Sequence, residues 1–156
     1  MVVRRANMND IDGINRLLIQ VLKVHHDGRP DLFKALGKKY NDEQLKKIIS
    51  DENTPVFVAM DDTGSVVGHA FCIFRLTENS NVLNTIKTLY IDDLCVDEKS
   101  RGKHIGSLLY DNVVDFARKS DCYNITLNVW SCNEGAMKFY KSCGLVPQSI
   151  TMEKIL

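Results

Sequence analysis

The stretch that most constrains the fold is residues 90–109, YIDDLCVDEKSRGKHIGSLL, where a strand pattern changes to a helical one across a polar turn. Two adjacent acids, Asp92 and Asp93, interrupt the strand, which continues directly with Leu-Cys-Val. An acid within an apolar strand is costly to bury without a partner, so a position in mid-strand favours a functional role. Neighbouring strand residues point to opposite faces, so the two acids should do different work unless a bulge re-aims them.

The turn that follows, residues 101–107 (RGKHIGS), has the composition of an anion cradle. Gly102 and Gly106 permit close approach of the backbone, the first N–H groups of a helix lack partners, and Arg101 and Lys103 add positive charge. A solvated basic turn explains this segment alone equally well. The spacing differs from both G-x-x-x-x-G-K-[ST] and G-x-G-x-x-G, which disfavours a P-loop or Rossmann nucleotide site.

The remaining sequence predicts a mixed α/β (α+β) chain, a mixed sheet with helices on its faces. A helix begins at Asn9 or Asp10 and is broken by the loop HHDGRP at 25–30. The other predicted helices are 31–36, 42–49, 104–118 and 134–143; the predicted strands are 2–5, 55–60, 66–74, 88–96, 124–130 and 149–155. With 156 residues, the length predicts a single domain, 1–156.

Composition excludes several classes of protein. Twenty basic and twenty acidic residues give no net charge, which disfavours a nucleic-acid binder that relies on bulk positive charge. The acids are concentrated in residues 51–100, and basic segments flank them. The sequence has neither a run long enough for a membrane helix nor the apolar region of a signal peptide. Five cysteines without C-x-x-C spacing indicate reduced thiols, so we expect a cytoplasmic protein without membrane partners.

A third feature is residues 133–144, NEGAMKFYKSCG, an amphipathic helix that Asn133 can cap and Gly144 can end. Taken alone, Tyr140 in such a helix is most often core or rim. Together, the three segments resemble the GNAT superfamily of acetyl-CoA-dependent N-acetyltransferases. The family's loop pattern Arg/Gln-x-x-Gly-x-Gly/Ala stands here as residues 101–106, and its signature Asn-x-x-Ala-x-x-Phe-Tyr-x-x-x-Gly stands here as residues 133–144. Within the family, the chain looks most like the spermidine/spermine N-acetyltransferase group.

The resemblance implies a GNAT-like, mostly antiparallel sheet with helices on both faces, and direct transfer of acetyl from acetyl-CoA to a primary amine in a ternary complex. Asp92 takes the position of the general base, Asp93 is the second candidate or a substrate contact, and Tyr140 is the acid for the leaving thiolate. The implied acetyl-CoA contacts are Leu94, Cys95, Val96, Arg101, Gly102, Lys103, His104, Ile105, Gly106, Ser107, Asn133, Ala136 and Phe139. His104 replaces the central loop glycine of the family, a steric cost if that position requires a positive φ.

Alternatives remain open. A non-catalytic acyl-CoA-binding module on the same fold would explain the exchange at His104. Cys95 could carry a ping-pong mechanism, although a cysteine between Leu and Val is more often inert packing. His25 and His26 lack partners with metal-ligand spacing, and no metal is expected. The acceptor, a polyamine-like or a peptide amine, would be chosen by residues 20–45, where Arg29 and Tyr40 are candidates. A homodimer through the apolar C-terminal segment is compatible with the sequence.

Overall fold

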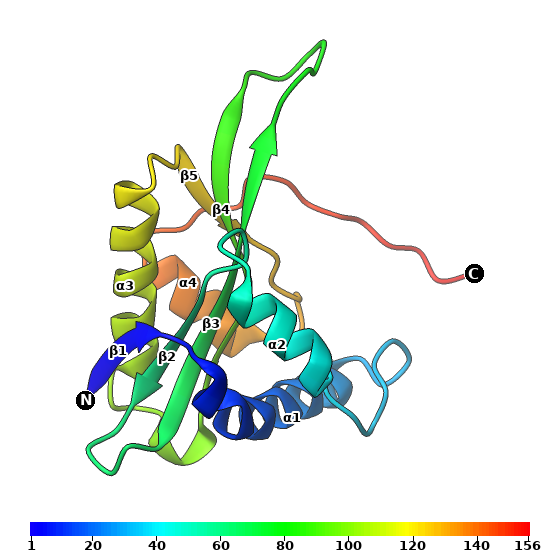
Figure 1. Ribbon diagram of the computed structural model, residues 1–156. Helices are drawn as coiled ribbons and strands as arrows, with labels where there is room; N and C mark the ends of the chain where they lie inside the picture. Colours follow the sequence, from blue (N-terminus) through cyan, green and yellow to red (C-terminus); the bar gives the residue numbers. More distant parts are fainter.

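The computed structural model describes all 156 residues, and its centre is a five-stranded sheet in the order β1-β2-β3-β4-β5. The strands are β1 (Val2–Arg5), β2 (Val56–Met60), β3 (Val66–Thr77), β4 (Ile86–Val96) and β5 (Asn124–Leu127). All neighbouring strands are antiparallel except β4 and β5, which are parallel. The far ends of β3 and β4 extend beyond the body of the sheet as a hairpin arm (Figure 1). The mixed, mostly antiparallel sheet expected from the sequence is confirmed.

Helices cover both faces of this sheet. The helices are α1 (Ile11–Gly28), α2 (Asp42–Ser50), α3 (Ile105–Lys119) and α4 (Glu134–Ser142), with short 3-10 turns η1 (Met8–Asp10) and η2 (Glu98–Ser100). Figure 1 shows α1 and α2 on one side of the strands and α3 on the other. Each side has its own core: Leu17 and Leu45 pack against Val58 and Phe71 on one face, and Leu109 and Val113 pack against the opposite face.

Local signals explain why these helices begin where they do. Asn7 opens η1, which leads into α1, and Asn41 opens α2; in each case the asparagine and a side chain three residues later form a capping box. Asn133 accepts a hydrogen bond from the backbone N–H of Ala136 and so caps α4, as predicted from the sequence. These side chains satisfy N–H groups that a helix start leaves without a partner.

Two expectations are wrong, and a third is shifted along the chain. The break predicted at 25–30 comes late in that range, because α1 runs through His25 and His26 and ends at Gly28. Residues 31–36 form turns rather than a helix, and Leu36 is exposed because no core lies beneath it. Residues 149–155 form no strand: the C-terminal segment extends from the body without joining the sheet (Figure 1), Glu153 binds Arg29, and Ile150, Met152, Ile155 and Leu156 are exposed.

Trp130, the last residue of the strand predicted at 124–130, lies outside the sheet. The strand ends at Leu127, and Trp130 is 41% exposed. Phe57 and Phe71, in contrast, are buried in the two cores. All five cysteines are free thiols, and no helix has the length and apolar character needed to cross a membrane.

Candidate active site

A β-bulge in β4 decides where the two acids point. Phe71 of β3 pairs with Asp93, whereas the next residue, Cys72, pairs with Ile91, so Asp92 is the extra residue of β4. An extra residue reverses the alternation of side chains beyond it. Leu89 and Ile91 therefore face the α3 side, while both Asp92 and Asp93 reach partners on the α1 and α2 side. Both acids therefore lie on one face of the sheet. Neighbouring strand residues can do this only where a bulge interrupts their alternation.

Asp92 is bound by two side chains from the loop between α1 and α2. The Lys39 ammonium donates to Asp92 Oδ2 at 2.7 Å and to the Asp92 carbonyl oxygen at 3.1 Å. The Tyr40 hydroxyl donates to the same carboxylate oxygen, and its ring packs against Phe71. Burial raises the pKa of Tyr40 above its usual value, and the hydrogen bond to Asp92 raises it further. The candidate Tyr40 thus lines the site, whereas Arg29 binds Asp31 and Glu153 instead.

Asp93 has a different partner, which sequence reasoning missed. His69 of β3 is fully buried, and its Nε2 lies 2.7 Å from Asp93 Oδ2. The other ring nitrogen, Nδ1, is buried without a hydrogen-bond partner, and the ring contacts the edge of Phe71. A histidine inside the apolar run VVGHAFCIF was the available signal, because a buried polar side chain needs a partner. The acid pair consequently contains one carboxylate near the surface and one inside the sheet.

Beyond the bulge, one edge of β4 has no neighbouring strand. The parallel pairing with β5 ends at Ile91 and Leu127, while β4 continues alongside β3 to Val96. Strands expose alternate N–H and C=O groups on each edge, so on the side away from β3 residues 92–96 present backbone groups that no strand pairs with. An extended ligand could pair there as an additional strand. This is where Leu94, Cys95 and Val96 were predicted to bind the pantetheine arm.

The Cys95 side chain does not reach that edge as a nucleophile. It is 6% exposed and packs in the core beneath α1, where its Sγ lies 3.8 Å from the carbonyl oxygen of Leu17. Burial raises the pKa of the Cys95 thiol to about 12, so the reactive thiolate is disfavoured near neutral pH. The geometry supports the interpretation of Cys95 as packing.

The turn between β4 and α3 has the features of an anion-binding loop. The backbone N–H groups from Arg101 to Ser107 make no hydrogen bond within the chain, and α3 starts without a side-chain cap. Gly102 has φ 79° and His104 has φ 59°, both in the left-handed region. Arg101 and Lys103 are exposed beside these donors. The positive φ at His104 confirms that this residue stands where glycine would be less strained.

Helix α4 packs against the start of α3, and its Tyr140 lies within the electrostatic influence of Asp93. A Cβ atom on Gly106 would lie 3.3 Å from the Phe139 ring, so the glycine permits this close approach. Ala136 and Phe139 lie in the helix behind the loop, and Phe139 packs against the core on the α3 side. Burial raises the pKa of Tyr140, and the charge of Asp93 raises it further. A phenol that stays protonated above neutral pH can act as a proton donor.

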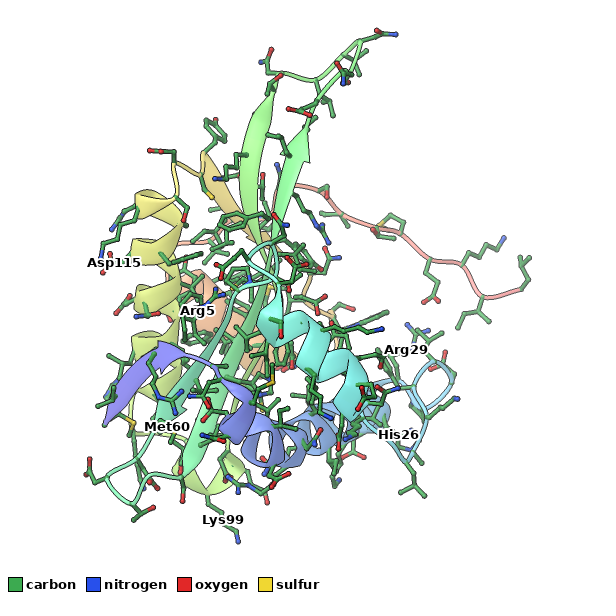
Figure 2. All side chains as sticks on the ribbon, viewed as in Figure 1. Arg5, His26, Arg29, Met60, Lys99 and Asp115 are labelled. Atoms are coloured by element: carbon green, nitrogen blue, oxygen red, sulfur yellow. The ribbon has the colours of Figure 1, made fainter.

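An aromatic group borders the site at the end of α1. The ring of Phe33 stacks against His25 at 4.9 Å and meets Trp130 edge-on at 5.2 Å. His26 lies 2.8 Å from the Phe33 carbonyl oxygen and fixes this part of the loop. Figure 2 shows His26 and Arg29 where α1 passes into that loop. No group of histidine, cysteine and acidic side chains in the structure could hold a metal ion.

Known proteins resemble the chain in sequence. The family model described as "Acetyltransferase (GNAT) family" matches residues 21–145. A glucosamine 6-phosphate N-acetyltransferase from Arabidopsis thaliana is 28% identical over 117 residues, which cover 75% of this chain and 68% of that protein. Further curated proteins of the same name match over half of their length or less. These relatives share the predicted superfamily, and none of them is a spermidine acetyltransferase.

Solved structures share the fold over the full length of the chain. A mutant of the BH1408 protein from Bacillus halodurans has a TM-score of 0.96 at 30% identity, covering 100% of this chain and 99% of that chain. An aminoglycoside N-acetyltransferase in complex with CoA has a TM-score of 0.73 at 15% identity, covering 99% and 98%. At such low identity the second likeness shows the fold alone.

Proposed function

Because the chain belongs to the GNAT family of acetyltransferases, we propose that it transfers acetyl directly to a primary amine in a ternary complex, without a covalent enzyme intermediate. Family membership makes it an N-acetyltransferase with acetyl-CoA as co-substrate. The observation that carries the proposal is the Asp92 carboxylate, which already holds a primary ammonium at 2.7 Å beside the open edge of β4.

The fit to acetyl-CoA rests on two sets of backbone groups, one without a neighbouring strand and one without hydrogen-bond partners in the chain. Leu94, Cys95 and Val96 lie on the open edge of β4, where they would pair with the pantetheine arm. The free N–H groups from Gly102 to Ser107 would bind the pyrophosphate, and Arg101 and Lys103 would add charge. Asn133, Ala136 and Phe139 would contact the cofactor from behind the loop: Phe139 packs beside Gly106, and Asn133 caps the first turn of α4 through the Ala136 N–H.

Asp92 is the proposed general base. An alkyl amine with a pKa of about 10.4 is almost wholly protonated at neutral pH and must lose a proton before it attacks a thioester. The Asp92 side chain is 17% exposed and can accept that proton, directly or through water. Asp93 is 9% exposed and bound to a buried histidine, which suits a fixed negative charge better than exchange with solvent.

Tyr140 is the proposed general acid. The leaving thiolate has a conjugate acid with a pKa of about 8.5, so a neutral phenol beside it is a suitable proton donor. A tyrosine is protonated near neutral pH, and burial raises the pKa of Tyr140 further, so the phenol is neutral where the enzyme would work. Tyr140→Phe should lower kcat by about 100-fold or more while acetyl-CoA binding stays within a few-fold. An unchanged kcat would remove Tyr140 from the mechanism.

The proposed acceptor is a small cationic amine of the polyamine type, as the resemblance to the spermidine/spermine group suggested. The acid pair supports it, because two carboxylates on one face attract a cation. Glucosamine 6-phosphate is a second candidate, since relatives are named for acetylating it and the cationic Lys39 lies beside Asp92.

Release of CoA thiol, measured with a panel of amines, tests the function. The panel contains a polyamine, glucosamine 6-phosphate, an aminoglycoside and a peptide with a free N-terminus. Turnover of the polyamine above the others supports the first acceptor, and preference for the sugar phosphate supports the second. Binding of acetyl-CoA without turnover of any amine would instead indicate a non-catalytic acyl-CoA-binding module.

A further inference from the structure

The loop between α1 and α2 carries a primary amine into the candidate active site. Lys39 Nζ lies 2.7 Å from Asp92 Oδ2 and 3.1 Å from the Asp92 carbonyl oxygen, and these two residues are 53 positions apart in the sequence. The side chain of Lys39 is 42% exposed, while that of Asp92 is 17% exposed. The amine thus occupies the place that the proposed mechanism gives to the amine of an acceptor.

Contacts on both sides of Lys39 hold it in this position. Lys38 binds Asn15 of α1 at 2.7 Å and Asp42 of α2 at 2.6 Å. On the other side, the Tyr40 hydroxyl donates to Asp92 and its ring packs on Phe71. Lys39 Nζ also lies 5.5 Å from the centre of the Tyr40 ring. A nucleophile tethered in this way has a high effective concentration at the reacting group.

We propose that Lys39 is acetylated by the protein's own active site, in an intramolecular reaction with acetyl-CoA that rests on the proposed function. The Lys39 ammonium gives one proton to Asp92, which passes it to solvent. The free amine attacks the thioester carbonyl and a C–N bond forms; the nitrogen then gives its second proton to solvent through Asp92, and the C–S bond breaks. The thiolate leaves and takes a proton from Tyr140, which is reprotonated by solvent. The products are Nε-acetyl-lysine, CoA and one released proton.

The modification changes what the site can bind. An acetylated lysine carries no charge and cannot form the ion pair with Asp92. The Asp92 carboxylate then loses its resident cation, and an acceptor ammonium no longer has to displace Lys39 to reach it. Acetylation of Lys39 would therefore lower the KM for a cationic acceptor.

Isotopically labelled acetyl-CoA, incubated with the full chain and followed by intact mass and fragmentation of peptides, tests the proposal. Lys38 is the internal control. It is adjacent in sequence and its ammonium also binds a carboxylate, but that carboxylate belongs to Asp42, at 2.6 Å, and not to Asp92. We expect label on Lys39 at a rate about tenfold or more above Lys38, because only Lys39 is held at the active site. The labelled fraction should grow at a rate independent of protein concentration.

Two variants separate an enzymatic reaction from chemical acetylation. Asp92→Asn should slow labelling of Lys39 and leave that of Lys38 unchanged, and Lys39→Arg should remove the labelled site, with circular dichroism checking that each variant is folded. Equal labelling of Lys38 and Lys39, or labelling of Lys39 that does not depend on Asp92, overturns the proposal. CoA release with an added amine but no label on Lys39 overturns this inference alone. If neither CoA release nor label on Lys39 is observed, the proposed function is overturned together with this inference.

Discussion

Asp92 and Asp93 are neighbours in sequence and face the same side of the sheet, but their surroundings differ in kind. Asp92 meets Lys39 and Tyr40, two side chains that a loop brings to the rim of the site. Asp93 meets His69, a fully buried residue of the adjacent strand. The charge of Asp92 raises the pKa of Tyr40, and that of Asp93 raises the pKa of both Tyr40 and Tyr140. Partners at the rim can be displaced, which leaves Asp92 able to take up a proton. The buried His69 instead holds the Asp93 side chain in one position.

The sharpest test of this difference is Asp92→Asn, for which we expect the largest effect. Loss of the general base should lower kcat/KM for the amine by about 100- to 10,000-fold. The free energy of unfolding should change by less than about 1 kcal/mol, because the ion pair with Lys39 is partly exposed. Steady-state kinetics and urea unfolding measure the two quantities. A loss of stability without a loss of kcat/KM would show that Asp92 has a structural role and is not the general base.

The opposite pattern is expected for Asp93→Ala. Removal of the carboxylate leaves His69 buried without its hydrogen-bond partner, which should lower the free energy of unfolding by about 1–3 kcal/mol. Urea unfolding with Asp92→Ala as the matched control measures the contrast. If both alanine variants lose the same stability, the distinction between a rim acid and a buried acid is wrong.

The pH dependence of kcat should move when the charge at Asp93 is removed. Tyr140 must be protonated to donate, and its raised pKa places the loss of activity at a higher pH than an ordinary tyrosine would. Asp93→Asn removes a cause that raises this pKa, so activity should be lost at a lower pH. The shift should be a fraction of a pH unit, because burial is the larger cause. A shift to higher pH would contradict the effect of the Asp93 charge on the pKa of Tyr140.

The smallest effect is expected outside the acid pair, at His104→Gly. Relief of the left-handed conformation gains about 1 kcal/mol, and the greater freedom of glycine in the unfolded chain offsets part of it. Stability should rise by less than about 1 kcal/mol, and acetyl-CoA should bind a few-fold more tightly. Calorimetric titration and thermal unfolding measure both, with His104→Ala as the control that keeps the strain. Weaker acetyl-CoA binding in the glycine variant would show that the imidazole contributes to the cradle.

The parts of the molecule that the sequence predicts correctly depend on local signals. The helix α4 follows from the cap at Asn133 and the glycine at Gly144, and α3 follows from an apolar stripe beginning at Ile105. A helix at 31–36 was wrong because apolar spacing needs a core to cover, and Leu32 and Leu36 are exposed. The C-terminal strand was wrong because strand propensity alone supplies no neighbouring strand to pair with.

The candidate site shows the same division between local and distant causes. The loop at 101–107 was visible because its glycines and basic residues are contiguous. That both acids share a face follows from the pairing of Phe71 with Asp93, a register between strands that no local pattern specifies. Lys39 and Asp92 are 53 positions apart, and His69 and Asp93 are 24 positions apart. No periodic pattern in the sequence indicates contacts over such separations.

The bulge at Asp92 divides β4 into two half-strands with opposite parity. In the first half, Leu89 and Ile91 face α3 and the strand pairs with β5; beyond Asp92, Leu94 and Val96 face α3 and the β5 side is open. Removal of this one residue would make the pairing with β3 regular and leave both half-strands on their present faces, because Ile91 already pairs with Cys72 and Asp93 with Phe71. The bulge therefore adds a second acid to one face of the sheet without changing which residues β4 presents to either core.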